Sequence, residues 1–394
     1  MWRRVGFALL LGVLVVAVPV LGLVGYRTLS NSTDGRFAKT SSNPEAPGYV
    51  AQVEPTPTAV VIQYDKAHLP VGATFLSLSS PAGGGAVIFV PLNIGVLLPK
   101  LGAGPLKAAY LAFADKPEVA RDQLAAKVGD VLNVGVGEVA ELDDARWAQL
   151  VTPVAPLRFD NPEEVVLADG TVIPAGLTDL TADNVGPYLA VTKGAESETA
   201  RFVRSQVVWK AWLDQVAKAG PGSVPGETTT GIGHFAQRLA AGTVSYDSVP
   251  VVASGGPLFN VAKDVTADLV TDAVPSPTPS HPGSRFTIRV LDGVSPGSIP
   301  PDLTRSLVRA GASVTVIGNA PSFGQTTTNV VYGDRADALT AKSVLRRIGG
   351  TGKARFDAEA PDTVDLTIVL GTDILGAAPA TTTSPATTTT TQGP

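Results

Sequence analysis

Two arginines one helical turn apart, Arg201 and Arg204, are the residues in this chain best suited to chemistry, with Lys193 and Glu198 shortly before them. A guanidinium stays charged and binds two phosphate oxygens at once, so such a pair can grip a phosphate or pyrophosphate. The alternative is a solvated helix face on which the arginines pair with Glu196 or Glu198, as surface charges commonly do. For Lys193 the alternative is an ordinary loop lysine.

Several other kinds of chemistry find no support in the sequence. The chain has no cysteine, which excludes disulfides, thiolate nucleophiles and cysteine metal sites. Its three histidines, His68, His234 and His281, are scattered, so we expect no metal and no cofactor. The net charge is −5, the pI is near 5.3 and no basic patch stands out, so nucleic acid is not an expected partner.

The arginines fall within an expected helix over residues 199–219. Phe202, Trp212 and Val216 recur in it at helical spacing, which predicts a stripe that faces a core. Other helices are expected over 117–129, from Asp143 onward, over 181–188 and over 235–241. Short apolar runs bounded by Pro, Gly or charge predict strands over 59–64, 73–78, 86–90 and 249–252. This mixture of strands and helices indicates the α/β class.

A second block, from residue 286 to residue 370, repeats the mixture more compactly. Strands are expected over 286–291, 313–317, 327–332 and 364–370, and helices over 300–310 and 335–348. Gly311 follows the first of these helices as a C-cap, and Gly349 and Gly350 stop the second. The order β-α-β-β-α-β suits a two-layer sandwich of about 90 residues.

The N-terminus carries an apolar run from Val5 to Tyr26 with no charged side chain. As a helix rising about 1.5 Å per residue, this run spans roughly 33 Å, enough to cross a hydrocarbon core of about 30 Å. Two arginines precede it and only Arg27 follows it closely, so we expect a single-pass cell-membrane protein with a cytoplasmic N-terminus and an extracytoplasmic bulk. A cleaved signal peptide is the alternative, but its apolar region is usually only about 7–15 residues long.

Composition divides the rest of the chain. Residues 1–27 are the cytoplasmic start and the transmembrane helix, and residues 28–57, without hydrophobic periodicity, are expected to be a flexible stalk. Residues 58–273 and 285–375 are the two folded domains, separated by a Pro/Ser linker over 274–284. Residues 376–394 contain almost only Ala, Thr, Pro, Gly and Ser, which predicts a disordered tail.

The smaller domain resembles the C-terminal domain of LytR-type proteins in the LytR–CpsA–Psr (LCP) family. Three motifs carry the resemblance: Ile288–Gly293 after a strand, Gly318–Ser322 before a Thr-rich strand, and Val369–Asp373 near the end. Residues 58–273 look like a divergent LCP catalytic domain. There, Ile173–Leu180 is similar to the family's "LPAGTQHL" and Arg201–Gln206 to its Arg-x-x-Arg-Gln-Gln helix.

Active members of the family transfer glycopolymers from polyprenyl-pyrophosphate carriers to peptidoglycan. The resemblance therefore implies that Arg201 and Arg204 face a pyrophosphate, with Glu198 as the candidate for the family's aspartate before the arginine helix. Mg²⁺ held by carboxylates would neutralise the leaving group in such a reaction. Lys193 is a partial substitute for an Arg-x-Arg pair that this chain lacks.

The chain departs from the family pattern at most of the charged positions. Leu92-Asn93 stands where the family has Arg-Asp after a strand-end proline, and Ala73 replaces an aspartate before Thr74. Each lost arginine removes charge-assisted bonds, and preorganised electrostatics usually dominates catalysis. We therefore expect a non-catalytic relative that binds a polyprenyl-linked glycopolymer, peptidoglycan or an envelope protein. The alternatives are an active LCP phosphotransferase using Mg²⁺ and an interaction scaffold built on the C-terminal domain.

Overall fold

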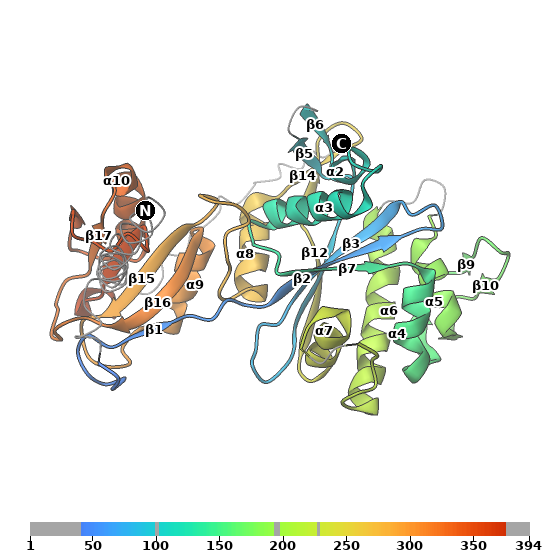
Figure 1. The fold of residues 1–394 in the computed structure, drawn as a ribbon, viewed down its shortest axis with the longest axis horizontal. Helices are drawn as coiled ribbons and strands as arrows, with labels where there is room; N and C mark the ends of the chain where they lie inside the picture. The colour runs from blue at the N-terminus through green and yellow to red at the C-terminus, as the bar shows by residue number, and fades with distance from the viewer. Residues whose placement is uncertain (1–40, 99–101, 193–197, 227–228, 376–394) are drawn as a thin grey trace, which may run out of the picture. The chain divides into compact units, whose positions relative to one another are not determined.

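The computed structural model describes residues 41–98, 102–192, 198–226 and 229–375, which form two compact units (Figure 1). Among the described residues, the larger unit comprises Glu54–Arg285, and the smaller unit comprises residues 41–53 together with residues 286–375. The apolar run, Lys193 and the Thr/Pro tail lie outside the described residues. Within the described ranges, no helix is both long enough and apolar enough to cross a membrane.

A five-stranded mixed sheet in the order β12-β4-β3-β2-β7 forms the centre of the larger unit. Its strands are β2 (Thr58–Tyr64), β3 (Pro70–Ser77), β4 (Gly85–Val90), β7 (Glu138–Leu142) and β12 (Val244–Ser248). β2, β3 and β4 pair antiparallel, whereas β12 joins β4 and β7 joins β2 in parallel.

Helices cover both faces of this sheet. They are α2 (Ala108–Leu111), α3 (Pro117–Leu132), α4 (Asp144–Val151), α5 (Ala182–Ala190), α6 (Glu198–Ala219), α7 (Gly231–Ala240) and α8 (Lys263–Ala273). Helices α3 and α8 lie on one side of the sheet and α4 to α7 on the other (Figure 1). Alternate residues of one strand point to opposite faces, so Val60 belongs to the apolar cluster on the α3 side and Val61 to the cluster on the α6 side. The sheet therefore has a hydrophobic core on each side.

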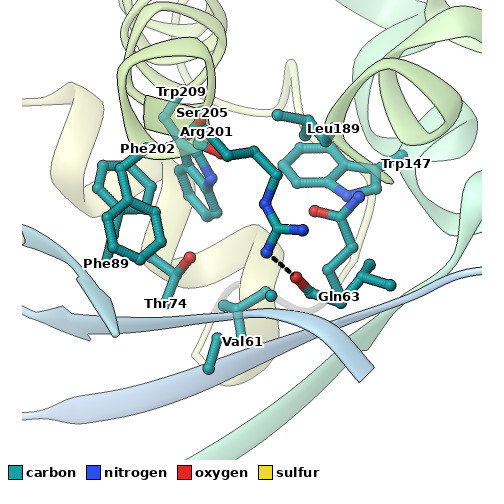
Figure 2. Close-up of a pocket in the computed structure, with 13 residues that line it drawn as sticks. Val61, Gln63, Thr74, Phe89, Trp147, Leu189, Arg201, Phe202, Ser205 and Trp209 are labelled. Atoms are coloured by element: carbon teal, nitrogen blue, oxygen red, sulfur yellow. Dashed lines mark hydrogen bonds between the residues drawn. The ribbon is translucent and has the colours of Figure 1, made fainter. Parts of the chain in front are cut away.

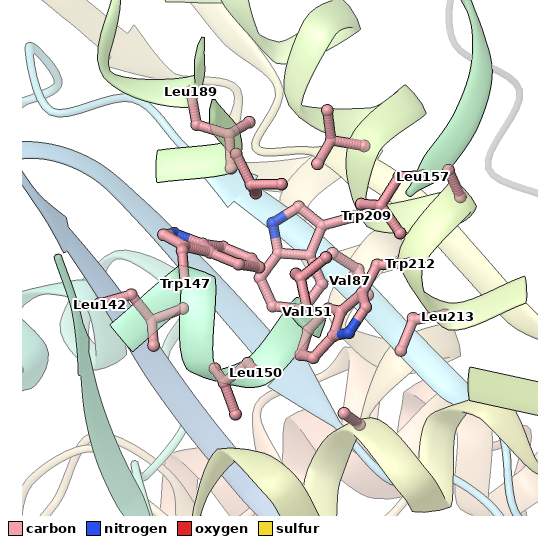
Figure 3. Packing of buried hydrophobic residues seen from close by; sticks show 14 of the residues in the cluster. Val87, Leu142, Trp147, Leu150, Val151, Leu157, Leu189, Trp209, Trp212 and Leu213 are labelled. Carbon is pink, nitrogen blue, oxygen red and sulfur yellow. The ribbon is translucent and has the colours of Figure 1, made fainter. Parts of the chain in front are cut away.

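Three tryptophans fill the core beneath α6. Trp147 on α4 lies edge-on to Trp209 and Trp212 of α6, with ring centroids 5.5 and 5.4 Å apart (Figure 3). All three side chains are buried, which confirms the prediction that the α6 aromatic residues belong to a core. Aromatic pairs in this arrangement add to the free energy gained by burying their surface.

Short paired strands complete the larger unit. They are β5 (Gly95–Leu98) with β6 (Gly102–Pro105), β8 (Leu157–Asn161) with β11 (Gly176–Leu180), β9 (Val165–Val166) with β10 (Val172–Ile173), and β13 (Val251–Ala253) with β14 (Phe259–Val261). Each pair is antiparallel, and together they form the margins of the sheet's two cores.

A six-stranded sheet in the order β1-β16-β15-β19-β17-β18 forms the smaller unit. Its elements are β1 (Val50–Gln52), β15 (Phe286–Asp292), α9 (Pro301–Arg309), β16 (Ala312–Asn319), β17 (Asn329–Tyr332), α10 (Ala338–Arg347), β18 (Ala354–Phe356) and β19 (Leu366–Val369). The predicted β-α-β-β-α-β order is present, with β1 and β18 as additional edge strands. Leu307 of α9 and Ala341 of α10 pack against the sheet in one apolar cluster.

Two segments expected to be unstructured are partly ordered. The predicted stalk over 28–57 contains β1, which pairs with β16. A three-residue strand has no periodicity of its own, so the sequence alone could not reveal it. The predicted linker over 274–284 is part of the larger unit, where the Thr278 carbonyl accepts from the Gly135 amide at 2.8 Å and the Ser276 amide donates to Thr56 Oγ1 at 3.0 Å.

Candidate functional site

Helix α6 places Arg201 and Arg204 toward the interior of the larger unit. Their exposed fractions are 7% and 1%, so neither lies on a solvated helix face as the alternative interpretation held. Charged side chains are buried only where partners compensate for lost hydration. The identity of those partners therefore decides what the two guanidiniums can do.

Arg204 is held by protein groups on two segments. Its Nη1 forms an ion pair with Glu163 at 2.8 Å, and its Nη2 donates to the Val191 carbonyl at 2.9 Å. Glu163 is 43% exposed, so one member of the pair remains in contact with solvent. This arrangement joins α6 to the loop after β8 and to the end of α5.

Arg201 is directed toward the sheet instead. Its guanidinium donates to the main-chain carbonyl of Val71 on β3, as the dashed line in Figure 2 shows. Thr74 and Gln63, from the same pair of strands, lie around it (Figure 2). Arg201 thus joins α6 to β3 from inside the fold.

Glu198 contacts the loop that follows β4. Its carboxylate accepts a hydrogen bond from the Asn93 backbone amide at 3.1 Å. Leu92, the residue before Asn93, is 2% exposed and belongs to the core on the α3 side of the sheet. The position at which the family carries an arginine is therefore occupied here by a core leucine.

A small cavity lies beside Arg201, between α6 and the β2–β3 strands. Its walls include Phe89, Phe202, Trp147 and Leu189, and its free volume is about 20 Å³. A cavity needs at least about 10–15 Å³ on this scale to hold one water molecule. The stacked rings of Phe89 and Phe202, with centroids 5.6 Å apart, close one side of it (Figure 2). A space of this volume suits a water molecule.

Three of the predicted site residues, Arg201, Arg204 and Glu198, lie on α6, and the fourth, Lys193, lies outside the described residues. The hydrogen bonds of Arg201, Arg204 and Glu198 lead to four different segments, and among the described residues the cavity beside Arg201 is not lined by Arg204 or Glu198. Glu163 and the Val71 carbonyl are partners that sequence reasoning missed. In the sequence, only the charge of Glu163 could have suggested it as a partner for an arginine, and a main-chain carbonyl leaves no such signal. No cluster of three or more His, Cys, Asp or Glu suited to a metal occurs within the described ranges.

Other polar residues considered in the sequence have structural roles. Asp143 caps α4 by accepting from the Arg146 amide at 2.7 Å. The Gly83–Gly85 turn adopts positive φ throughout, and a Cβ on Gly84 would lie 2.4 Å from the Thr243 carbonyl oxygen, so close backbone approach requires glycine there. His68 has a side chain that is 53% exposed and stacks on Tyr64 at 4.3 Å.

Two aspartates of the C-terminal motifs organise loops in the smaller unit. Asp292 accepts from the Ser298 amide at 2.7 Å and from the Val294 amide at 3.0 Å. Asp373 accepts from the amide and hydroxyl groups of both Thr328 and Thr351. Burial opposes ionisation of Asp373, but these hydrogen bonds outweigh it and lower the pKa to about 2.

Comparison with known proteins identifies the smaller unit. Residues 285–373 match the family model described as "LytR cell envelope-related transcriptional attenuator". The predicted LytR-type C-terminal domain is thereby confirmed for these residues. A search of curated proteins found no match.

Solved structures of LCP proteins are also similar to this chain. B. subtilis TagT has a TM-score of 0.44 at 14% identity, with 59% of this chain and 98% of TagT covered. B. subtilis TagV has a TM-score of 0.44 at 12% identity, with 55% and 97% covered. A third structure, described as the LytR-CPS2A-psr family protein YwtF (TagT) with bound octaprenyl pyrophosphate lipid, has a TM-score of 0.43 at 13% identity, with 59% and 98% covered.

Proposed function

We propose that this chain is a membrane-anchored protein of the cell envelope, a divergent LCP relative that acts by binding and not by group transfer. Its ligand is a polyprenyl-linked or wall polymer, or an envelope protein. The LytR-type C-terminal domain and the order of the LCP-like motifs support a role in the envelope. The uncharged run at Val5–Tyr26 supports the anchor.

The engagement of both arginines with the protein itself carries the non-catalytic part of the proposal. A transferase must aim cationic groups at charge that develops on a pyrophosphate. Here Arg204 is paired with Glu163 and Val191, and Arg201 with the Val71 carbonyl. The adjoining cavity, as the described residues bound it, has a free volume of about 20 Å³, which is the space of about one water molecule. We therefore propose that a ligand binds the domain elsewhere.

The remaining positions of the expected constellation support the same conclusion. Leu92 contributes to the core where an arginine would bind phosphate, and Ala73 is buried within β3 at the position of the family's aspartate. Glu198, the candidate carboxylate for Mg²⁺, accepts from the Asn93 amide. We propose no cofactor; Mg²⁺ would be needed only by the active alternative.

Turnover of a polyprenyl pyrophosphate by the purified full chain in detergent micelles with Mg²⁺ tests this proposal. We expect release of phosphate or pyrophosphate at the rate of the protein-free control. The Arg201→Ala and Arg158→Ala variants should release it at the same rate as the native chain. Arg158 is the control position, because it is exposed and pairs with Asp179 on the β8–β11 strands. Turnover by the native chain that is retained in Arg158→Ala and lost in a folded Arg201→Ala protein would establish the active alternative.

A further inference from the structure

The segment from Asn43 to Val53 lies along the outer edge of β16 in the smaller unit. Its strand β1 pairs antiparallel with β16, in a register that places Ala51 opposite Ile317. Main-chain hydrogen bonds continue beyond the strand at both ends, from the Gly48 amide to the Ala320 carbonyl at 3.0 Å and from the Val53 amide to the Thr315 carbonyl at 2.9 Å. Residues 48–53 of the segment are therefore held by backbone pairing.

Asn319, from the second C-terminal motif, contributes a side chain to the same contact. Its Nδ2 donates to the carbonyls of Pro44 and Ala46, both at 2.8 Å, and its backbone amide donates to the Tyr49 carbonyl at 2.7 Å. The side chain is 5% exposed. A carboxamide has two N–H donors, and both donate here to peptide carbonyls. Asn319 therefore recognises the backbone of the segment and not its side chains.

Gly318 permits the close approach of the segment. A Cβ at this position would lie 2.1 Å from the Tyr49 carbonyl oxygen and 2.8 Å from Val50 Cα. Separations below about 3.0 Å do not occur for real Cβ atoms, and the obstructing atoms belong to the main chain. Any other residue at position 318 would push β1 away from the sheet.

We propose that the β16 edge, with Gly318 and Asn319, is a binding site for an extended peptide, which this chain fills with its own residues 43–53. Addition of a strand to a sheet edge is a common mode of peptide recognition, and an uncovered edge exposes unpaired backbone groups. The matched family region begins at residue 285, so it contains the acceptor edge and not the strand that covers it. The site does not depend on whether the larger unit is catalytic.

Amide hydrogen exchange in the full chain tests the contact in place. Gly318→Ala and Asn319→Ala should each accelerate exchange at residues 48–53 by at least about tenfold, which corresponds to about 1.4 kcal/mol. Gly333→Ala is the matched control, because a Cβ there meets its nearest neighbour at an ordinary 3.6 Å. Unchanged protection of residues 48–53 in both variants would overturn the proposal.

A second measurement applies if either variant destabilises the whole smaller unit. Ala51→Pro disables the chain's own strand without altering the acceptor edge, because proline lacks the N–H and disrupts pairing. A fluorescent synthetic peptide of residues 43–54 should bind the full-length Ala51→Pro protein saturably and the native protein at least tenfold more weakly. The same peptide carrying proline at position 51 should not bind. Absence of binding to the Ala51→Pro protein, or equal binding of both peptides, would overturn the proposal.

Discussion

Arg204 combines nearly complete burial with partners from two other segments of the larger unit. Its ion pair with Glu163 and its bond to the Val191 carbonyl engage both terminal nitrogens of the guanidinium. The spacing of Arg201 and Arg204 predicted a helix face capable of gripping an anion. It could not reveal whether that face meets a ligand or the protein itself, because the partners are distant in sequence or belong to the main chain.

Substitution of Arg204 by alanine should destabilise the larger unit. Removal of one member of a buried pair typically costs about 3–5 kcal/mol, since the remaining groups lose their partner. We expect a loss near the lower end, about 3 kcal/mol, because Glu163 keeps access to solvent. Urea unfolding of the full chain measures this loss. Arg158→Ala is the control and should change the free energy of unfolding little, because Arg158 belongs to an exposed arginine–carboxylate pair. Equal stability of Arg204→Ala and the native chain would argue that Arg204 is kept for a ligand.

Asp373 makes a pH-dependent contribution in the smaller unit. Its folded pKa of about 2 lies below its ordinary value, so its hydrogen bonds stabilise the fold at neutral pH and are lost as the pH falls from about 4 to about 2. Asp373→Asn should cost roughly 1 kcal/mol at pH 7, a small value because the carboxylate is partly exposed and screened. The difference from the native chain should shrink across that acid range.

Thermal unfolding at several pH values, with the exposed Asp362→Asn as the control, measures this difference. A native–variant difference that stays constant from pH 7 to pH 2 would show that ionisation of Asp373 does not contribute.

At the scale of elements, periodicity predicted helix α6 and the three central strands β2, β3 and β4, but it missed β7 and β12 of the same sheet and helix α8. Helix α6 was expected over residues 199–219 and spans Glu198–Ala219, because its apolar stripe repeats for several turns. Strands of two or three residues, such as β1 and β9, were missed, since so few residues cannot display a period. Their existence depends on partners supplied by the tertiary fold.

The tryptophan cluster that fixes α6 should be a major source of stability for the larger unit. Trp212→Ala removes a fully buried indole in contact with Trp147 and Trp209, and such truncations cost about 3–5 kcal/mol. Lys210→Ala, on the exposed face of the same helix, should change the free energy of unfolding by less than about 0.5 kcal/mol. Similar urea midpoints for the two variants would contradict the assigned role of the cluster.

At the scale of the whole molecule, the smaller unit is built from two segments that are far apart in the sequence. The larger unit is inserted in the sequence between β1 and β15, two strands of the smaller unit's sheet. The first strand or helix within the described residues is therefore β1, which belongs to the smaller unit. No pattern in residues 28–57 indicated this connection.

Membrane topology can be tested by cysteine labelling, because the native chain has no cysteine. In intact bacterial cells, Ser79→Cys on the exposed surface of the larger unit should react with a membrane-impermeant maleimide. Trp2→Cys should react only after lysis, since the run at Val5–Tyr26 would hold it in the cytoplasm. Loss of residue 2 from the mature chain would indicate a cleaved signal peptide, and labelling of Trp2→Cys in intact cells would reverse the orientation.

The central claim is that Arg201 and Arg204 stabilise the fold and do not hold a pyrophosphate. Calorimetric titration of the full chain with a polyprenyl pyrophosphate and Mg²⁺ tests it most directly, alongside an Arg201→Ala variant shown by thermal unfolding to be folded at the assay temperature. We predict that the native chain and the variant give the same isotherm, whether or not the lipid binds elsewhere on the protein. Saturable binding to the native chain that weakens at least tenfold in Arg201→Ala would contradict the account.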